Sequence, residues 1–181
     1  DILFGEVSPS GRLPITFPKN VDQLPPYEDY SMQGRTYKFM QEEPLFPFGF
    51  GLSYTSFEYD DLQLSQQKLE DNEHLSVSCR ITNMGSMDGD DVAQLYLVPI
   101  DDDENTAQYM LKRFQRVTLA AGAQQEVVFN LSPSDFEMIN QEGQSTWVPG
   151  QYQLIIGNAL PSKRSSDLGA SSPLMAVIQL Q

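Results

Sequence analysis

From Phe57 onward, apolar and polar residues alternate along much of the chain with a period of two. Successive side chains of a β-strand point to opposite faces, so this alternation predicts half-buried strands. The pattern predicts strands near residues 57–64, 74–83, 91–98, 111–119, 125–131, 145–148, 151–157 and 173–180. Short strands separated by turn signals, such as Pro149-Gly150, are typical of a β-sandwich.

The same alternation predicts which side chains point into the core. The expected inward side chains are Leu75, Val77, Cys79 and Ile81; Phe114, Val117 and Leu119; Val127 or Val128, Phe129 and Leu131; Trp147; and Tyr152, Leu154 and Ile156. For residues 91–98 two sets stay open: Val92, Tyr96 and Val98, or Ala93, Leu95 and Leu97. Ser132 followed by Pro133 predicts one helical turn, and the composition of residues 161–172 predicts a mobile loop.

The residues before this alternating region do not form a unit that could bury itself. Residues 1–5 resemble the last turn of a helix, with Gly5 as the residue that ends it. Within residues 12–18, alternating apolar side chains and prolines predict an edge or terminal strand, and residues 19–42 predict a long ordered loop. One helix end and one strand cannot cover each other, so we expect an N-terminal part to be missing from this chain.

Residues 43–57, here called the junction, separate the two regions. The junction combines aromatic side chains with Pro44, Pro47, Gly49 and Gly51. Proline fixes φ and glycine admits positive φ, so the backbone is strongly specified but cannot form a regular helix. The aromatic side chains can each bury a large area, so we expect the junction to be packed rather than free.

Composition excludes several classes of function. The 181 residues carry 25 acidic and 11 basic side chains, a formal net charge of −14. A negative field repels phosphate groups, so nucleic acids and anionic membrane surfaces are not expected partners. No apolar stretch is long enough to span a membrane. Cys79 is the only cysteine, so no intrachain disulfide can form; the compartment stays unknown, with a periplasmic or secreted location favoured.

Several stretches resemble glycoside hydrolase family three. Residues 44–55, PLFPFGFGLSYT, resemble the family signature that joins an α/β-sandwich domain to a fibronectin type III-like domain. Further similar stretches are residues 5–18, 77–85, 89–96, 111–119 and 149–152. The resemblance implies that residues 1–57 are the C-terminal remnant of the α/β-sandwich domain plus a linker loop. Residues 58–181 would then form the fibronectin type III-like (immunoglobulin-like) β-sandwich, which makes the fold mainly β.

This resemblance also implies an activity for the longer protein. It implies an exo-acting, retaining β-glycosidase that releases terminal β-linked xylose or glucose from oligosaccharides, without a cofactor. Both catalytic carboxylates of such an enzyme would precede Asp1, so the chain is expected to be structural and inactive alone, with no catalytic residue. Its expected partners are the missing N-terminal catalytic domains and, through them, the oligosaccharide. The alternative is a carbohydrate- or protein-binding β-sandwich module.

Two residues are candidates for substrate binding in the intact enzyme. Residues 34–39, GRTYKF, resemble a motif of the β-xylosidase branch of the family. The resemblance implies that Arg35 donates to sugar hydroxyls and that Tyr37 stacks on a sugar ring. The alternative is that Arg35 binds a local carboxylate and Tyr37 packs at the domain interface.

The remaining polar residues give weaker candidates. Glu42 and Glu43 are adjacent and favour a solvated pair, and His74 has no second histidine or cysteine with which to bind zinc. Trp147 could stack on a sugar, although a core position is favoured. Oxygen ligands for Ca²⁺ could come from the acidic turn at Asp88, Asp90 and Asp91 or from Asp101–Glu104, but the EF-hand spacing is absent. We therefore predict no metal site.

Overall fold

A computed structural model describes residues 1–100, 107–140 and 142–181, so the acidic run Asp101–Glu104 lies outside the described residues. The strands are β1 (Phe57–Leu64), β2 (Lys68–Leu69), β3 (Leu75–Asn83), β4 (Gly89–Pro99), β5 (Met110–Leu119), β6 (Gln124–Leu131), β7 (Glu137–Ile139), β8 (Ser145–Trp147), β9 (Gly150–Gly157) and β10 (Leu174–Leu180). The α-helices are α1 (Thr36–Phe39) and α2 (Lys163–Asp167), and 3₁₀ turns cover Ile2–Phe4, Val21–Gln23 and Pro133–Asp135.

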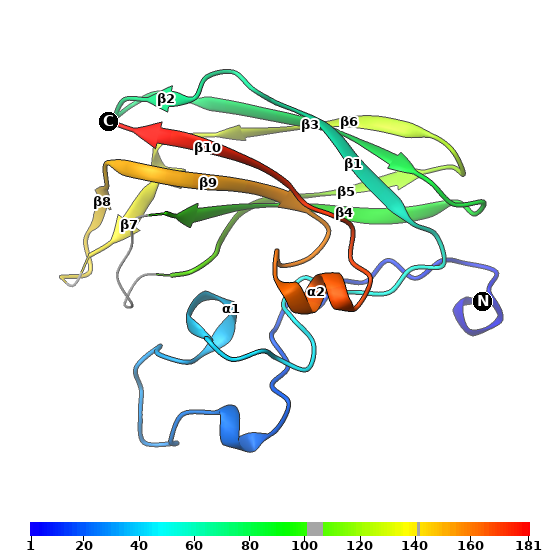
Figure 1. Cartoon of the computed structure of the whole chain (residues 1–181), viewed down its shortest axis with the longest axis horizontal. Coiled ribbons are helices and arrows are strands. Elements are labelled where there is room, and N and C mark those ends of the chain that lie inside the picture. The colour runs from blue at the N-terminus through cyan, green and yellow to red at the C-terminus, as the bar shows by residue number, and fades with distance from the viewer. Residues whose placement is uncertain (101–106, 141) are drawn as a thin grey trace.

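Two sheets pack face to face as a sandwich (Figure 1). One sheet has the strand order β1-β3-β6, and the other has the order β2-β10-β9-β4-β5. The pairs within both sheets are antiparallel except for β10 with β2, and β7 and β8 form a separate hairpin. The prediction of a mainly β sandwich is confirmed.

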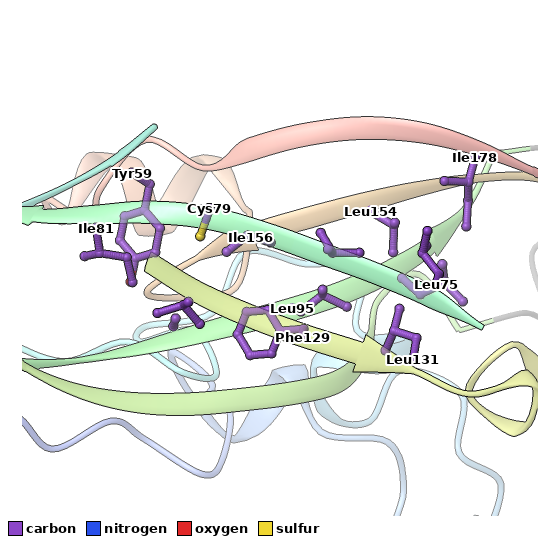
Figure 2. Packing of buried hydrophobic residues seen from close by; sticks show 14 of the residues in the cluster. Tyr59, Leu75, Cys79, Ile81, Leu95, Phe129, Leu131, Leu154, Ile156 and Ile178 are labelled. Atoms are coloured by element: carbon purple, nitrogen blue, oxygen red, sulfur yellow. The ribbon is translucent and has the colours of Figure 1, made fainter. Parts of the chain in front are cut away.

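The main core lies between the two sheets (Figure 2). In β3, Leu75, Val77, Cys79 and Ile81 are buried and alternate with half-buried residues, as the period of two predicts. Facing them from the five-stranded sheet are Leu95, Leu154, Ile156 and Ile178. Burial raises the pKa of the Cys79 thiol to about 11, so the thiol stays protonated at neutral pH and is inert.

Side-chain placement corrects the inward set at several positions. Val127 is buried and Val128 is exposed, and in β4 the set Ala93, Leu95 and Leu97 faces the main core. The prediction for Phe114 is wrong, because this side chain is 70% exposed. Phe114 lies opposite Gln94, and a register shift between Leu95 and Tyr96 interrupts the pairing of β4 with β5. Because of this shift, the alternation of inward and outward side chains does not run unbroken along β5.

Three predictions about individual elements are wrong or incomplete. Within residues 12–18 the structure has a single bridge, between Phe17 and Phe46, in place of an edge strand. The stretch 161–172 contains helix α2, whose Ser162 side chain accepts a hydrogen bond from the Ser165 amide. The short strands β2 and β7 were not predicted, whereas the helical turn after Ser132 is confirmed.

Most of residues 1–50 and helix α2 lie on the outer side of the five-stranded sheet (Figure 1). Residues 55 and 56 reach the end of β3, where the Thr55 hydroxyl donates to the Asn83 side chain and the Met84 amide donates to the Ser56 carbonyl at 2.8 Å. Gly5 adopts φ 77° and ends the first 3₁₀ turn, as expected from its position. The loop at 19–42 contains the turn Val21–Gln23 and helix α1. Within the described ranges, no helix has the length and apolar character needed to cross a membrane.

The contrast between two side chains of β5 gives a first prediction. Leu119 is 4% exposed and Phe114 is 70% exposed. Leu119→Ala should lower the free energy of unfolding by about 2–5 kcal/mol, because it removes buried methyl groups and leaves a cavity. Phe114→Ala, the matched control on the same strand, should change it by about 0.5 kcal/mol or less. Urea unfolding of both variants measures this, and equal losses would contradict the assigned register.

Candidate functional site

The outer face of the five-stranded sheet carries a second, smaller core. Tyr96 of β4 and Ile155 of β9 are buried there together with Leu160, which precedes α2. Tyr37 and Phe48 pack against this cluster, and their rings stack with centroids 4.2 Å apart. The junction and helix α1 are therefore fixed to the sandwich by apolar contacts.

Glycine permits the close approach of the junction to its neighbours. Gly49 has φ 74°, and a Cβ there would lie 2.1 Å from Oε1 of Gln94. A Cβ on Gly51 would lie 2.0 Å from the carbonyl oxygen of Gly11. The Gln94 amide donates to the Gly49 carbonyl (3.1 Å) and to the Asn158 carbonyl (2.9 Å). Side chains at the two glycine positions would thus force the junction away from β4 and from the N-terminal segment.

A buried ion pair joins the N-terminal segment to the sandwich. Nη2 of Arg12 lies 2.5 Å from Oδ1 of Asp91, and the two side chains are 8% and 0% exposed. Asp91 also accepts hydrogen bonds from the Tyr59 hydroxyl (2.9 Å), the Val92 amide (2.9 Å) and the Asn158 amide (3.3 Å). Burial and the neighbouring carboxylate raise the pKa of Tyr59 well above its usual value, so Tyr59 stays a donor. The Asp91 carboxylate is therefore fully partnered.

In the acidic turn, which the sequence offers as a source of Ca²⁺ ligands, Asp91 is a buried partner of Arg12. Asp90 binds the guanidinium of Arg116, and Asp88 accepts a hydrogen bond from the Ala121 amide at 2.9 Å. These three carboxylates have separate partners and do not converge. In the part of the chain that the structure describes, no group of three or more His, Cys, Asp or Glu side chains could hold a metal ion.

Arg35 forms hydrogen bonds with the backbone of the loop that precedes α1. Its Nε donates to the Ser31 carbonyl at 3.0 Å, and its Nη2 donates to the Asp29 carbonyl at 2.5 Å. The Asp29 carboxylate accepts from the Ser31 amide, and this hydrogen bond lowers the pKa of Asp29. Arg35 thus donates to backbone carbonyls of its own loop, and Tyr27 and Tyr30 of that loop are each 88% exposed.

Tyr37 lies between the loop and the sandwich. Besides stacking on Phe48, it meets Tyr96 edge to face at a centroid distance of 6.3 Å. Its hydroxyl accepts a hydrogen bond from the Leu111 amide at 3.4 Å, and burial raises the pKa of Tyr37. A hollow of about 210 Å³ adjoins this ring, with Glu42 and Glu43 in its wall. Tyr37 is therefore packed against the sandwich, with Glu42 and Glu43 in the wall of the adjoining hollow. The Arg35 guanidinium donates instead to carbonyls of its own loop.

The carboxylates near Tyr37 have partners of their own. Glu43 binds Lys19 at 2.6 Å, and a hydrogen bond from that ammonium lowers the pKa of Glu43. Glu42 accepts from the Gln23 amide at 2.9 Å. A glycosidase general acid needs a raised pKa. Among the residues that the structure describes, the carboxyl groups with a shifted pKa, namely Asp29, Glu43, Asp90 and Asp135, are all shifted downward.

The other candidates lie apart from this region. His74 is exposed in the loop before β3. Trp147 is half-buried, meets Phe136 edge to face with centroids 5.9 Å apart, and donates from Nε1 to the Gln181 carbonyl at 3.0 Å. Its ring is therefore part of the core packing.

Sequence reasoning missed the Arg12–Asp91 pair, because 79 residues separate its members. A signal was present: Asp91 shares the register of Ala93, Leu95 and Leu97, which face the core. A carboxylate in an inward register must have a buried donor.

Comparisons with known proteins agree with this architecture. A profile described as the glycosyl hydrolase family 3 C-terminal domain matches residues 1–54, and one described as a fibronectin type III-like domain matches residues 91–159. The chain is 35% identical over 162 residues to a putative beta-xylosidase of Formosa agariphila, covering 87% of this chain and 21% of that protein. It is 34% identical over 169 residues to the periplasmic beta-glucosidase of Salmonella typhimurium, covering 87% and 22%.

A solved structure is also similar. The b-glucosidase EmGH1 of Erythrobacter marinus superimposes with a TM-score of 0.78 at 35% identity, over 99% of this chain and 23% of that one. The fold and junction therefore define a fibronectin type III-like sandwich attached to the end of a second domain. The chain belongs to glycoside hydrolase family 3 and corresponds to the C-terminal region of its members. It spans about a fifth of the length of the curated relatives that it matches.

The buried ion pair gives a second prediction. Arg12→Met leaves the Asp91 carboxylate without its cation and should lower the free energy of unfolding by about 3–5 kcal/mol. Arg12→Met combined with Asp91→Asn should cost less than the sum of the two single changes, because the pair acts as a unit. Arg116→Met, which removes a pair whose arginine is 62% exposed, is the control and should cost about 1 kcal/mol or less. Urea unfolding measures all four variants, and additive losses would contradict coupling.

Proposed function

We propose that this chain is the supporting C-terminal region of an exo-acting β-glycosidase. The longer protein would hydrolyse terminal β-linked xylose or glucose from oligosaccharides with retention of configuration. One observation carries the proposal: residues 1–54, which match the family's C-terminal domain, are locked to the sandwich through the buried Arg12–Asp91 pair. This attachment would hold the sandwich in one position against the domains that cleave the bond.

We further propose that the domain boundary lies at residue 57, with residues 1–57 completing an α/β-sandwich domain and residues 58–181 forming the supporting sandwich. Much of the first part is apolar and exposed. The most exposed of its large apolar side chains are Leu3, Phe4, Val21, Tyr27, Tyr30 and Leu52. Exposed apolar side chains in this number favour an interface, and the preceding catalytic domains are the partner proposed for it.

A binding module is less well supported. Such a module would present a row of exposed aromatic side chains on one face of the sandwich. In the described strands, Phe114 is the one aromatic side chain among the exposed large hydrophobic residues. A single ring does not form a platform, so the supporting role is favoured.

A direct activity measurement tests the proposal. The longer polypeptide that contains this chain should release p-nitrophenol from p-nitrophenyl β-D-xyloside or β-D-glucoside, and the faster substrate identifies the sugar. The 181-residue chain alone should give no release above buffer, because neither carboxylate of the reaction belongs to it. Turnover at an enzymatic rate by the chain alone, shown pure by mass, would contradict the proposal.

Arg35 and Tyr37 are proposed to contribute to oligosaccharide binding in that longer protein. Arg35 holds the loop that exposes Tyr27 and Tyr30, and Tyr37 connects this loop to the junction and to β4. An active-site mouth lined by this loop would therefore depend on both residues.

In the longer protein, Arg35→Ala should raise KM or lower kcat without lowering Tm, because it loosens a loop at the surface. The matched control is Arg80→Ala, which removes a pair with Asp60 on the outside of the sandwich. This control should leave KM, kcat and Tm close to the wild-type values. Steady-state kinetics with thermal unfolding separates the roles, and a lower Tm with unchanged kinetics would rule out substrate binding by Arg35.

A further inference from the structure

A second and larger hollow lies at the other end of the five-stranded sheet, and we call it the end pocket. It has a volume of about 840 Å³ and opens between helix α1, the start of β5, the β7–β8 hairpin and the start of β9. Small-molecule sites typically have volumes in this range. The end pocket is separate from the hollow beside Tyr37, with which it shares no lining residue.

The wall of the end pocket is largely apolar and adaptable. Met32, Met110 and Met138 line it, which is three of the seven methionines of the chain. Phe39 and Ile139 add further apolar surface. Methionine side chains are flexible and polarisable, and they are common at surfaces that accept ligands of varied shape. This lining suits an apolar or aromatic body better than a free sugar.

Two lysines give the end pocket a positive charge in an acidic protein. Lys38 and Lys112 both line it. The ion pairs of the described residues include neither lysine. Among the described acids near the pocket, Asp135 binds Arg113 through two contacts of 2.5 Å and Glu137 accepts from the Ser145 hydroxyl at 2.5 Å.

The Lys112 ammonium is held in an unfavourable environment. Burial lowers the pKa of Lys112, Asp135 opposes this change, and the charges of Lys38 and Arg113 add to it. A bound anion next to Lys38 and Lys112 would relieve both the desolvation and the repulsion. The two lysines favour an anionic group, and the apolar wall favours an apolar body. A ligand that combines a single anionic group with an apolar body satisfies both.

We propose that the end pocket binds a small amphipathic monocarboxylate, with its carboxylate at Lys38 and Lys112 and its apolar or aromatic body against the methionines. This site is independent of the glycosidase proposal, because it uses only residues of this chain. No covalent step is involved. Its occupation would add a cross-link between helix α1 and the β7–β8 hairpin.

Titration of the 181-residue chain with 3-phenylpropionate, followed by calorimetry and by NMR shifts of the methionine methyl groups, tests the proposal. The carboxylate should bind at least about tenfold more tightly than the neutral matched alcohol 3-phenyl-1-propanol, since a charge-assisted contact contributes about 1.4 kcal/mol or more. Acetate, which has the charge without the body, should bind too weakly to measure.

Variants locate the site. Lys112→Met keeps the apolar stem and should weaken 3-phenylpropionate binding at least about tenfold, whereas Lys112→Arg should retain most of it. Lys38 is exposed, so Lys38→Met should fold normally and also weaken binding. Lys68→Met, at the exposed position of β2 and outside the pocket, is the matched control and should bind as the wild type does.

Three results would overturn the inference. One is the absence of binding at ligand concentrations up to about 10 mM, which is tenfold the Kd of a millimolar site. Another is equal affinity for the carboxylate and the alcohol. The third is a loss of binding in Lys68→Met that equals the loss in Lys38→Met. None of these results would bear on catalysis by the longer protein, so failure here and failure of the proposed function are distinguishable.

Discussion

A carboxylate that is excluded from water needs a cation held against it, and this requirement links the two parts of the chain. Asp91 is 0% exposed at the end of the sandwich, and the cation that meets it comes from Arg12. Removing either group leaves an uncompensated buried charge, which costs several kcal/mol. The N-terminal segment therefore cannot detach from the sandwich without exposing the pair to water.

Strand β4 connects the two parts of the chain, because side chains on both of its faces are buried. Leu95 and Leu97 fill the main core, while Tyr96 on the opposite face packs in the second core with Tyr37 and Phe48. The Gln94 side chain holds the junction backbone at Gly49. If β4 were buried on its inner face only, residues 1–56 would have no apolar surface of the sandwich to pack against. Here these residues form a second layer that presents its own apolar surface outward.

Most of the sandwich could be predicted from the sequence, because one-sided burial leaves a period of two in strands such as β3. The pattern failed where both faces are buried, as in β4, and where a register shift interrupts pairing, as before Phe114. The junction could be recognised from its glycines and aromatic residues, but its partners could not. The Arg12–Asp91 pair and the end pocket depend on contacts between distant residues, which local patterns do not encode.

Native-state hydrogen exchange of the 181-residue chain tests most directly whether its two parts form one unit. The Leu13 amide donates to the Phe50 carbonyl at 2.9 Å, and the Gly49 amide donates to the Leu13 carbonyl at 2.8 Å. If the ion pair couples the parts, these two amides should exchange with the same opening free energy as the slowest amides of β3 and β4. Exchange of Leu13 and Gly49 at an opening free energy several kcal/mol lower, with β4 still protected, would contradict this account.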